Sequence, residues 1–482
     1  MEFVSIAAPG GDSPALGPRA RRRRRAAALL AVAGVLGCAG AGVWWIHGRA
    51  PQTPTGDGIF TLYVLGSSTA LGYPYFPQAN VGKIARLCVD GKIAGRPVRV
   101  VNVAGPGKTA RVTLRDAAEL VRRRPAAGLS AAFVYVGNNE FLRFDRRHDL
   151  RQQERRQFDT AAVTPEERDR VITRYEAQLQ ETLATLRDAG IRPYVSTVAI
   201  NLKDWEPNRS VLREVRNAAV VQALLDSAGA ARAAGNGGRA LQAYGRILEL
   251  EPHFALASYR AGICALEQGR RAAARAALQA AADDDGNPLR DTSEMTHAIW
   301  RAAARTGTPV VDAVKILNEA SPDSVLGDEM LWDNCHPKLE GYTRLAVAWA
   351  TALREQFDCT VRVPAQEELR AELGIDAAVD QDVLHREGQY AYGASTLVFD
   401  PGPRLARARA LLERADAISP SANVKCSIAV LEALAGHVPA ALDAWQKART
   451  LDPEVARNRM SSPAVQQIMA RHGVPDVTAA QR

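Results

Sequence analysis

Five short apolar segments recur along the first two thirds of the chain, each rich in β-branched, aromatic or aliphatic residues. They occupy residues 60–65, 98–103, 131–136, 192–200 and 309–311. Segments of this kind, ended by turn residues, are typical of buried strands. Stretches with helical periodicity lie between them, for example 113–123 and 165–189. Strands that alternate with helices predict an α/β fold with a doubly wound parallel sheet, in which ligands bind at the carboxyl ends of the strands.

The alternation stops between residues 206 and 290, where small and large apolar positions repeat instead. Three positions return 34 residues later, since Ala240, Tyr244 and Ile247 correspond to Ala274, Leu278 and Ala281. Small residues where paired helices approach and larger ones where they interlock resemble the tetratricopeptide repeat, which has this period. This segment is therefore predicted to be an all-α insertion of helical hairpins, with an alanine-rich hairpin of chance periodicity as the alternative.

A second repeated pattern lies near the end of the chain. The positions Ala408, Leu412 and Ala415 match Ala441, Trp445 and Ala448 at a spacing of 33 residues. This pattern predicts a C-terminal, tetratricopeptide-like helical region within residues 361–482. Residues 363–399 are weakly patterned, and no element is predicted there.

The N-terminal residues have a different character from the rest of the chain. Residues 1–25 form a basic tail, and residues 26–46 contain no charged side chain. An apolar run of about 20 residues is long enough to cross a membrane as a helix, and flanking arginines favour the cytoplasmic side. We therefore expect one transmembrane helix over 26–46, a linker over 47–58 and a catalytic part outside the cytoplasm. A lipoprotein signal cleaved before Cys38 and an ordinary cleaved signal are alternatives, and both also export the chain.

Charge and cysteine content narrow the classes of function. The formal net charge is +8, but six arginines of the basic tail supply most of it. The remainder carries no basic excess of the kind that nucleic-acid binding requires. The six cysteines never form a C-x-x-C pair, so no metal site is predicted and buried free thiols are expected.

Four short polar motifs stand after predicted strands or in a late loop. They are residues 66–69 (GSST), 101–109 (VNVAGPGKT), 136–140 (VGNNE) and 333–337 (DNCHP). Taken one at a time, the motifs have structural interpretations as helix caps, turns or a structural loop. Their common placement at one edge of the predicted sheet favours a shared site instead.

The fourth motif carries the clearest chemical argument. A serine hydroxyl is a weak nucleophile at neutral pH and needs an imidazole to accept its proton, while the imidazole needs a carboxylate to orient it. Asp333 and His336 bring acid and base together in one loop, and Ser68 supplies the hydroxyl at the mouth of the sheet. Cys335 lies between acid and base, where we interpret it as a small spacer whose thiol is open to oxidants.

In order and in placement, the four motifs resemble the blocks of the SGNH, or GDSL-type, serine hydrolases. The resemblance covers the segments 59–205 and 291–360 and implies a flavodoxin-like sheet. It assigns Ser68, Asp333 and His336 to catalysis. No cofactor and no metal are implied.

The resemblance also implies an oxyanion hole made of the backbone N–H groups of Ser68 and Gly107 and the side-chain amide of Asn139. Gly105 is the alternative glycine donor, and Ser67 is the alternative nucleophile. Two departures from the family pattern are visible. The aspartate before the nucleophile is missing, and a glutamate stands at position 140 where the family has an aspartate.

Three residues after the fourth predicted strand are expected to line the substrate pocket, namely Asn201, Asp204 and Trp205, with a long surface loop as the alternative. The predicted function is a membrane-anchored, extracytoplasmic serine esterase that cleaves an acyl ester through an acyl-serine intermediate. One alternative is an O-acyltransferase that acts on an envelope glycan with the same residues. The other is a tetratricopeptide scaffold with an inert hydrolase domain. The expected partners are the acyl-ester substrate, the membrane and a protein on the repeats, with no nucleic acid.

The predicted parts follow one another as two hydrolase segments separated by the insertion. In chain order they are a basic tail (1–25), a membrane anchor (26–46), a linker (47–58), a first hydrolase segment (59–205), a repeat insertion (206–290), a second hydrolase segment (291–360) and a C-terminal helical region (361–482).

Overall fold

The computed structural model describes residues 58–123, 128–142, 163–398 and 400–474. These belong to two compact units, one spanning Thr53–Pro420 and the other containing Ser421 onward. The predicted basic tail and membrane anchor lie outside the described residues. Among the helices that are described, none combines the length and apolar character needed to cross a bilayer.

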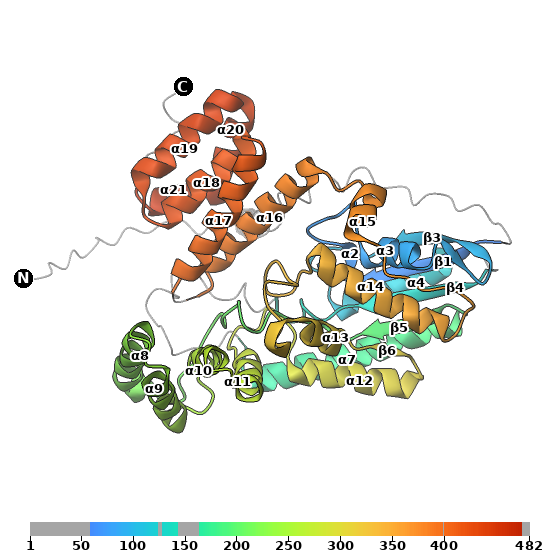
Figure 1. The fold of residues 1–482 in the computed structure, drawn as a ribbon, viewed down its shortest axis with the longest axis horizontal. Helices are drawn as coiled ribbons and strands as arrows, with labels where there is room; N and C mark the ends of the chain where they lie inside the picture. Colours follow the sequence, from blue (N-terminus) through green and yellow to red (C-terminus); the bar gives the residue numbers. More distant parts are fainter. Residues whose placement is uncertain (1–57, 124–127, 143–162, 399, 475–482) are drawn as a thin grey trace, which may run out of the picture. The chain divides into compact units, whose positions relative to one another are not determined.

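A six-stranded sheet forms the centre of the larger unit (Figure 1). Its strands are β1 (Phe60–Gly66), β2 (Lys92–Ile93), β3 (Arg96–Asn102), β4 (Ser130–Tyr135), β5 (Arg192–Ser196) and β6 (Val310–Val311). Their order is β2-β3-β1-β4-β5-β6, and all neighbours are parallel except β2 with β3. The five predicted strands are confirmed, but the short antiparallel edge strand β2 was not predicted and makes the sheet mixed.

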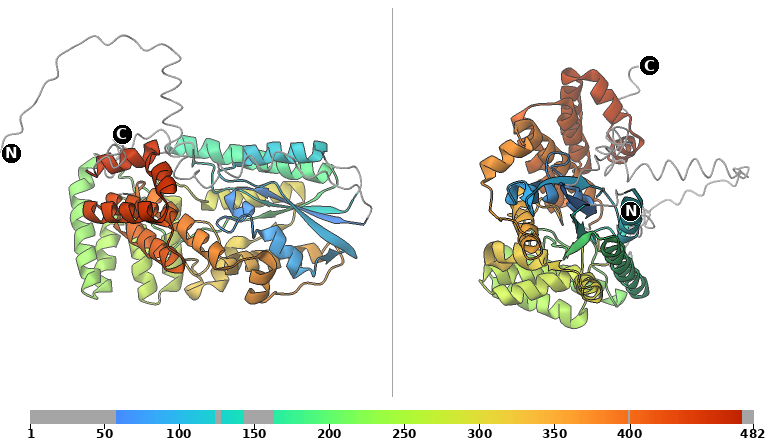
Figure 2. Two further views of the ribbon diagram at one scale, coloured as in Figure 1. Left: turned by 90° about the horizontal axis from the view of Figure 1, so that it is seen from above. Right: turned by 90° about the vertical axis from the view of Figure 1, so that its right-hand side faces the viewer.

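Helices cover the sheet on both faces (Figures 1 and 2). One layer contains α3 (Val81–Cys88) and α14 (Leu339–Arg354), and α13 (Ala313–Ala320) packs against α14. The layer on the other face contains α4 (Ala110–Arg123), α7 (Pro165–Asp188) and α12 (Ser293–Thr306). Every residue of β1 and of β4 is buried. This double cover explains why the central strands are continuous apolar runs rather than alternating patterns.

Helix α7 shows how local sequence sets an element of this layer. Thr164 and Glu167 form a reciprocal capping box at its start, and Pro165 occupies the first turn. Both features are favourable at a helix N-terminus. An apolar stripe then buries one face against the sheet and its neighbours: Val171, Tyr175, Leu179, Leu183 and Leu186.

The insertion consists of two antiparallel helical hairpins. Its helices are α8 (Ala218–Ala233), α9 (Gly237–Leu250), α10 (Ala255–Glu267) and α11 (Arg271–Asp283). All six positions of the 34-residue pattern are buried, as expected if they interlock the paired helices. Gly262 in α10 lies so close to α11 that a Cβ atom would stand 2.6 Å from Cγ of Leu278.

Helix α16 (Ala377–Ser395) lies in the segment without a predicted element. It forms a further hairpin of the larger unit with α17 (Gly402–Ile418), which carries the first half of the 33-residue pattern. Its packing repeats that of the insertion, because a Cβ atom on Gly388 would stand 2.6 Å from Cγ of Leu412. The short helix α15 (Gln366–Leu373) precedes it. The smaller unit contains α18 (Ala422–Leu434), α19 (Val438–Leu451), α20 (Pro453–Met460) and α21 (Pro463–Arg471).

Candidate active site

The turn after β1 presents a serine at the carboxyl edge of the sheet. Gly66 has a φ angle of +136°, and a Cβ atom there would lie 1.9 Å from the carbonyl oxygen of Tyr135 in β4. Only glycine fits such a turn, and it leads directly into the short helix α2 (Ser68–Leu71). The Ser68 Oγ atom lies 2.8 Å from Nε2 of His336. The hydroxyl of Ser67, by contrast, is buried without a hydrogen-bond partner in the described part of the chain.

The acid and the base lie together in the loop before α14. The Nδ1 atom of His336 is 2.6 Å from Oδ2 of Asp333, and the backbone N–H groups of Cys335 and His336 donate to Oδ1 at 2.9 and 2.8 Å. Asp333 is 1% exposed and His336 is 6% exposed. Burial raises the pKa of Asp333, but the His336 ring and these N–H donors outweigh it and hold the pKa below its ordinary value. The carboxylate is therefore ionised and oriented toward the imidazole.

Neighbouring segments fix the shape of this loop. Leu331 and Pro337 form an antiparallel bridge at its base. The side-chain amide of Asn334 donates to the Leu289 carbonyl at 2.7 Å, which ties the loop to the chain returning from the insertion. The backbone N–H of Asn201 donates to the Asn334 carbonyl at 2.9 Å. The loop is thus held from two sides by segments that are distant in sequence.

Two of the three predicted pocket residues support the loop from behind. Asn201 is 0% exposed, and its amide donates to the carbonyl of Asp333 at 3.1 Å and to Oδ1 of Asp328 at 2.8 Å. Asp204 accepts from the backbone N–H of Asp328 at 2.8 Å. The chain itself thus engages these polar groups, and the assignment of Asn201 and Asp204 to substrate contacts stays a prediction.

Trp205, the third predicted pocket residue, is also buried. Its ring packs against the guanidinium groups of Arg404 and Arg407, whose Cζ atoms lie 4.5 and 5.5 Å from the ring centroid. The ring of Tyr390 lies beyond it at a centroid distance of 6.0 Å. Trp205 therefore joins the loop after β5 to the α16–α17 hairpin, and its predicted contact with a substrate stays a prediction.

The loops after β3 and β4 carry the predicted oxyanion donors. Gly107 adopts a left-handed φ angle of +67°, and its N–H has no hydrogen-bond acceptor among the described residues. The alternative donor, Gly105, already donates its N–H to the carbonyl of Gly66 at 3.2 Å. Gly107 is thus the glycine with a free donor. The Asn139 amide donates one hydrogen to the Lys108 carbonyl at 3.0 Å, which leaves its second hydrogen available.

The polar residues beside Asn139 join these loops to one another. Glu140 accepts from the backbone N–H of Ala110 at 2.7 Å, the first residue of α4. A carboxylate is favourable at a helix N-terminus, so the longer side chain at position 140 has a structural use. Asn138 donates to Oγ1 of Thr69 at 3.3 Å, which links the loop after β4 to the nucleophile helix.

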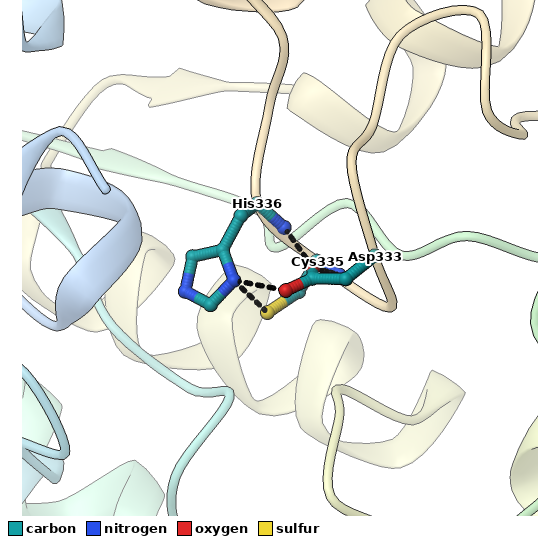
Figure 3. A group of neighbouring side chains, drawn as sticks. All are labelled: Asp333, Cys335 and His336. Carbon is teal, nitrogen blue, oxygen red and sulfur yellow. Dashed lines mark hydrogen bonds and ion pairs between the residues drawn. The ribbon is translucent and has the colours of Figure 1, made fainter. Parts of the chain in front are cut away.

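Asp333, Cys335 and His336 form a close buried group (Figure 3). Their ligand atoms lie within 4.8 Å of one another, the sort of spacing that a metal ion can use. Burial and the charge of Asp333 raise the pKa of the Cys335 thiol well above its ordinary value, whereas a metal ligand must be a thiolate. His336 Nδ1 also already faces Asp333. The donor set therefore fits proton transfer better than metal binding.

Helix α16 contributes groups to the site that the sequence pattern did not reveal. The Tyr390 hydroxyl donates to Oδ1 of Asn334 at 2.8 Å, and its ring meets the His336 ring edge-on at 5.9 Å. Arg386 donates to the carbonyl oxygens of Pro74 and Phe76, in the segment that follows α2, at 2.8 and 3.0 Å. Only the clustering of aromatic and charged residues near position 390 hints at this in the sequence.

Comparison with known proteins finds matches of two kinds. Residues 231–291 match the tetratricopeptide repeat family. No curated protein matches the chain in sequence. The tetratricopeptide resemblance predicted for the insertion is thus represented by a family match.

Three solved structures illustrate the second kind. A lipolytic protein of the G-D-S-L family from Veillonella parvula is 12% identical, with a TM-score of 0.32, and the match covers 62% of this chain and 98% of that one. The acetylxylan esterase Axe2 from Geobacillus stearothermophilus is 13% identical, with a TM-score of 0.31 and coverages of 62% and 94%. A lipase/acylhydrolase from Enterococcus faecalis is 14% identical, with a TM-score of 0.28 and coverages of 64% and 100%.

The atoms of this chain define what the site is equipped to do. Hydrogen bonds connect the Ser68 hydroxyl to the His336 imidazole, and this imidazole to the ionised Asp333 carboxylate, at the carboxyl edge of the sheet. The loops after β3 and β4, at the same edge of the sheet, carry a free backbone donor at Gly107 and a second amide hydrogen at Asn139. This combination of nucleophile, base, orienting acid and neutral donors is suited to acyl transfer through a tetrahedral intermediate.

Proposed function

We propose that the chain is a serine hydrolase that cleaves carboxylic esters, with Ser68 as nucleophile, His336 as base and Asp333 as the orienting acid. The observation that carries this proposal is the unbroken pair of hydrogen bonds, 2.8 Å from Ser68 to His336 and 2.6 Å from His336 to Asp333. Such a relay activates a hydroxyl that is otherwise a weak nucleophile.

In the proposed reaction, the Oγ–carbon bond forms while His336 takes the proton of Ser68. The N–H groups of Ser68 and Gly107 and the Asn139 amide stabilise the negative oxygen of the tetrahedral intermediate. As the bond from carbon to the alcohol oxygen breaks, His336 returns the proton to the leaving alcohol. Water, deprotonated by His336, then attacks the acyl-serine, and the acid and free Ser68 are released.

A panel of nitrophenyl esters of increasing acyl length tests this proposal with the full chain. We expect measurable hydrolysis by the wild type and loss of at least about 10³-fold in kcat for Ser68→Ala and for His336→Ala. Ser67→Ala is the matched control and retains activity, because the Ser67 hydroxyl contacts neither the base nor the acid. Hydrolysis that survives Ser68→Ala, or a wild type inert toward every ester, would refute the proposal.

The place of the enzyme in the cell is part of the same proposal. We propose that residues 26–46 anchor the chain in a membrane with the catalytic unit outside the cytoplasm; the basic residues before this apolar run support that orientation. A reporter enzyme that is active only after export, fused to the C-terminus, should be active. The same reporter placed before residue 26 should be inactive, and the reverse pattern would contradict the orientation.

The helical repeats suggest a protein partner for the enzyme. Solenoid hairpins of this kind present extended surfaces to other proteins, and the match at residues 231–291 supports this use.

A further inference from the structure

Glu387, in the middle of α16, is a buried acid without a partner. Its side chain is 1% exposed, and neither carboxyl oxygen has a hydrogen-bond partner in the described part of the chain. Leaving a buried polar group unpaired is costly, so such groups are rare in folded proteins and call for an explanation. The reaction proposed above makes no use of this residue.

Each basic side chain around Glu387 makes contacts elsewhere. Arg386 donates to two backbone carbonyl groups, Arg407 is paired with Asp328, and Lys338 lies 4.9 Å above the centroid of an indole ring. Glu387 is therefore not one half of a buried ion pair. Burial, and next the negative charge of Asp333, raise its pKa well above the ordinary value in spite of these cations. The raised pKa favours the neutral carboxyl group, which offers an O–H donor beside a free acceptor oxygen.

Glu387 lies on α16, the helix that borders one side of the catalytic histidine. Residues three apart on a helix share a face, so Glu387 lies one turn from Tyr390, whose ring touches His336. The preceding residue, Arg386, donates a hydrogen bond to the segment that follows the nucleophile helix. The carboxyl group thus belongs to the stretch of α16 that borders the catalytic loop, and the negative charge of Asp333 acts on it.

The role of His336 as the base determines which half of the ester lies next to it. In ester cleavage His336 passes its proton to the oxygen of the leaving alcohol, so the groups that surround His336 border the alcohol part of the substrate. A carboxyl group with one free donor and one free acceptor matches a hydroxyl, which also offers one of each. An alcohol without a second polar group would leave Glu387 unpaired.

We propose that Glu387 is a specificity-determining residue that hydrogen-bonds a free hydroxyl on the alcohol part of the substrate, so that the preferred substrates are esters of polyhydroxylated alcohols. The inference rests on the proposed esterase function and names the substrate class for that site. Sites built to bond a substrate hydroxyl discriminate strongly against analogues that lack it, because their own polar groups are then left unpaired.

Two esters that differ only in hydroxyl groups test the proposal. They are the 1-monoglyceride and the propyl ester of the same acid, which is the acid of the best nitrophenyl substrate. The release of this acid by the full-length protein is measured. We expect the wild type to favour the monoglyceride in kcat/KM by at least about tenfold, and Glu387→Leu to reduce this ratio by about tenfold or more. Glu387→Gln should keep most of the preference, because a carboxamide also donates and accepts.

The matched control is Glu432→Leu, the same exchange at a buried glutamate of the other compact unit, which should leave the ratio unchanged. A wild type without preference for the monoglyceride overturns the proposal. So does a Glu387→Leu variant that loses activity on both esters in equal proportion, the result expected if a water molecule bridges Glu387 to the chain. A wild type inert toward all esters identifies a failure of the esterase function itself, on which the proposal depends.

Discussion

The two sides of His336 are built by different means. On the side of the sheet, the loops after β1, β3 and β4 bring Ser68, Gly107 and Asn139 to one edge through tight turns and backbone hydrogen bonds. On the other side, helix α16 reaches the loop with the long side chain of Tyr390, and the buried Glu387 lies one turn away on the same helix. Sheet loops use short groups whose positions the backbone dictates, whereas the helix uses side chains whose reach depends on how its hairpin packs.

The two sides therefore have different tasks. The sheet side carries the reacting groups, and the helix side influences which substrate is chosen. Groups that must meet developing charge need placement within a fraction of an ångström, which rigid strands and their turns provide. A helix added outside the sheet borders the substrate without carrying the reacting atoms. Changes on the sheet side should therefore reduce turnover of every ester, while changes on α16 should act on positioning and on the choice of substrate.

The largest effect among the residues that flank the triad is expected for Asn139→Ala. The variant lacks one neutral donor to the intermediate, so we predict a loss of about 10²–10³-fold in kcat with little change in KM. Steady-state kinetics on a nitrophenyl ester, with a melting curve to verify folding, provides the measurement. A kcat within threefold of the wild type would show that Asn139 has no part in the oxyanion hole.

A smaller effect is expected for Tyr390→Phe, a change on the helix side. Loss of the hydroxyl leaves Oδ1 of Asn334 without its donor, and a loop that is less well fixed should lower kcat about tenfold, equivalent to about 1.4 kcal/mol. The KM should change little, because Tyr390 acts as a positioning residue through Asn334.

Tyr259→Phe is the matched control, since this hydroxyl also donates to a single acceptor, the Lys203 carbonyl at 2.6 Å. It should alter kcat less than Tyr390→Phe does. Equal losses in the two variants, or a Tyr390→Phe variant that only melts earlier, would reduce Tyr390 to a packing residue.

The smallest kinetic effect is expected for a matched pair of glycine variants. An added methyl group at Gly388 or at Gly262 meets a leucine of the facing helix at 2.6 Å, so each alanine variant should lose about 1–3 kcal/mol of stability by overpacking. Only Gly388→Ala displaces the helix that borders His336, and it should lower kcat/KM a few-fold beyond the effect of Gly262→Ala. Melting curves and kinetics on both variants make this comparison, and equal kinetic effects would contradict the special place of α16.

The sheet and the residues that meet at its edge are predictable from sequence, because their signals are local. A glycine at the end of a buried strand, as at Gly66, indicates a tight turn that other residues cannot adopt, and an aspartate three residues before a histidine has a direct chemical meaning. The order of the strands then brings these short motifs together. The same reasoning predicted the insertion, since the small and large positions of its helices recur at a fixed period.

The support of the site is not predictable in this way, because it depends on contacts between distant segments. Asn201 follows a strand, as many ligand-binding residues do, and only the packing of the 333–337 loop against it gives its amide a structural role. Tyr390 and Glu387 lie in a weakly patterned helix whose hairpin packs through one glycine. Beyond the clustered aromatic and charged residues, nothing in this stretch of sequence indicates that Asn334 and His336 are neighbours of Tyr390.

The most direct test of the central assignment is covalent labelling of the full chain with a fluorophosphonate, followed by peptide mass analysis. The Ser68–His336–Asp333 arrangement predicts a single phosphonylated residue, Ser68, at a rate that falls by orders of magnitude in His336→Ala and remains near the wild-type value in Ser67→Ala. An adduct on Ser67, on another residue, or a wild type that the reagent leaves unmodified would contradict the assignment.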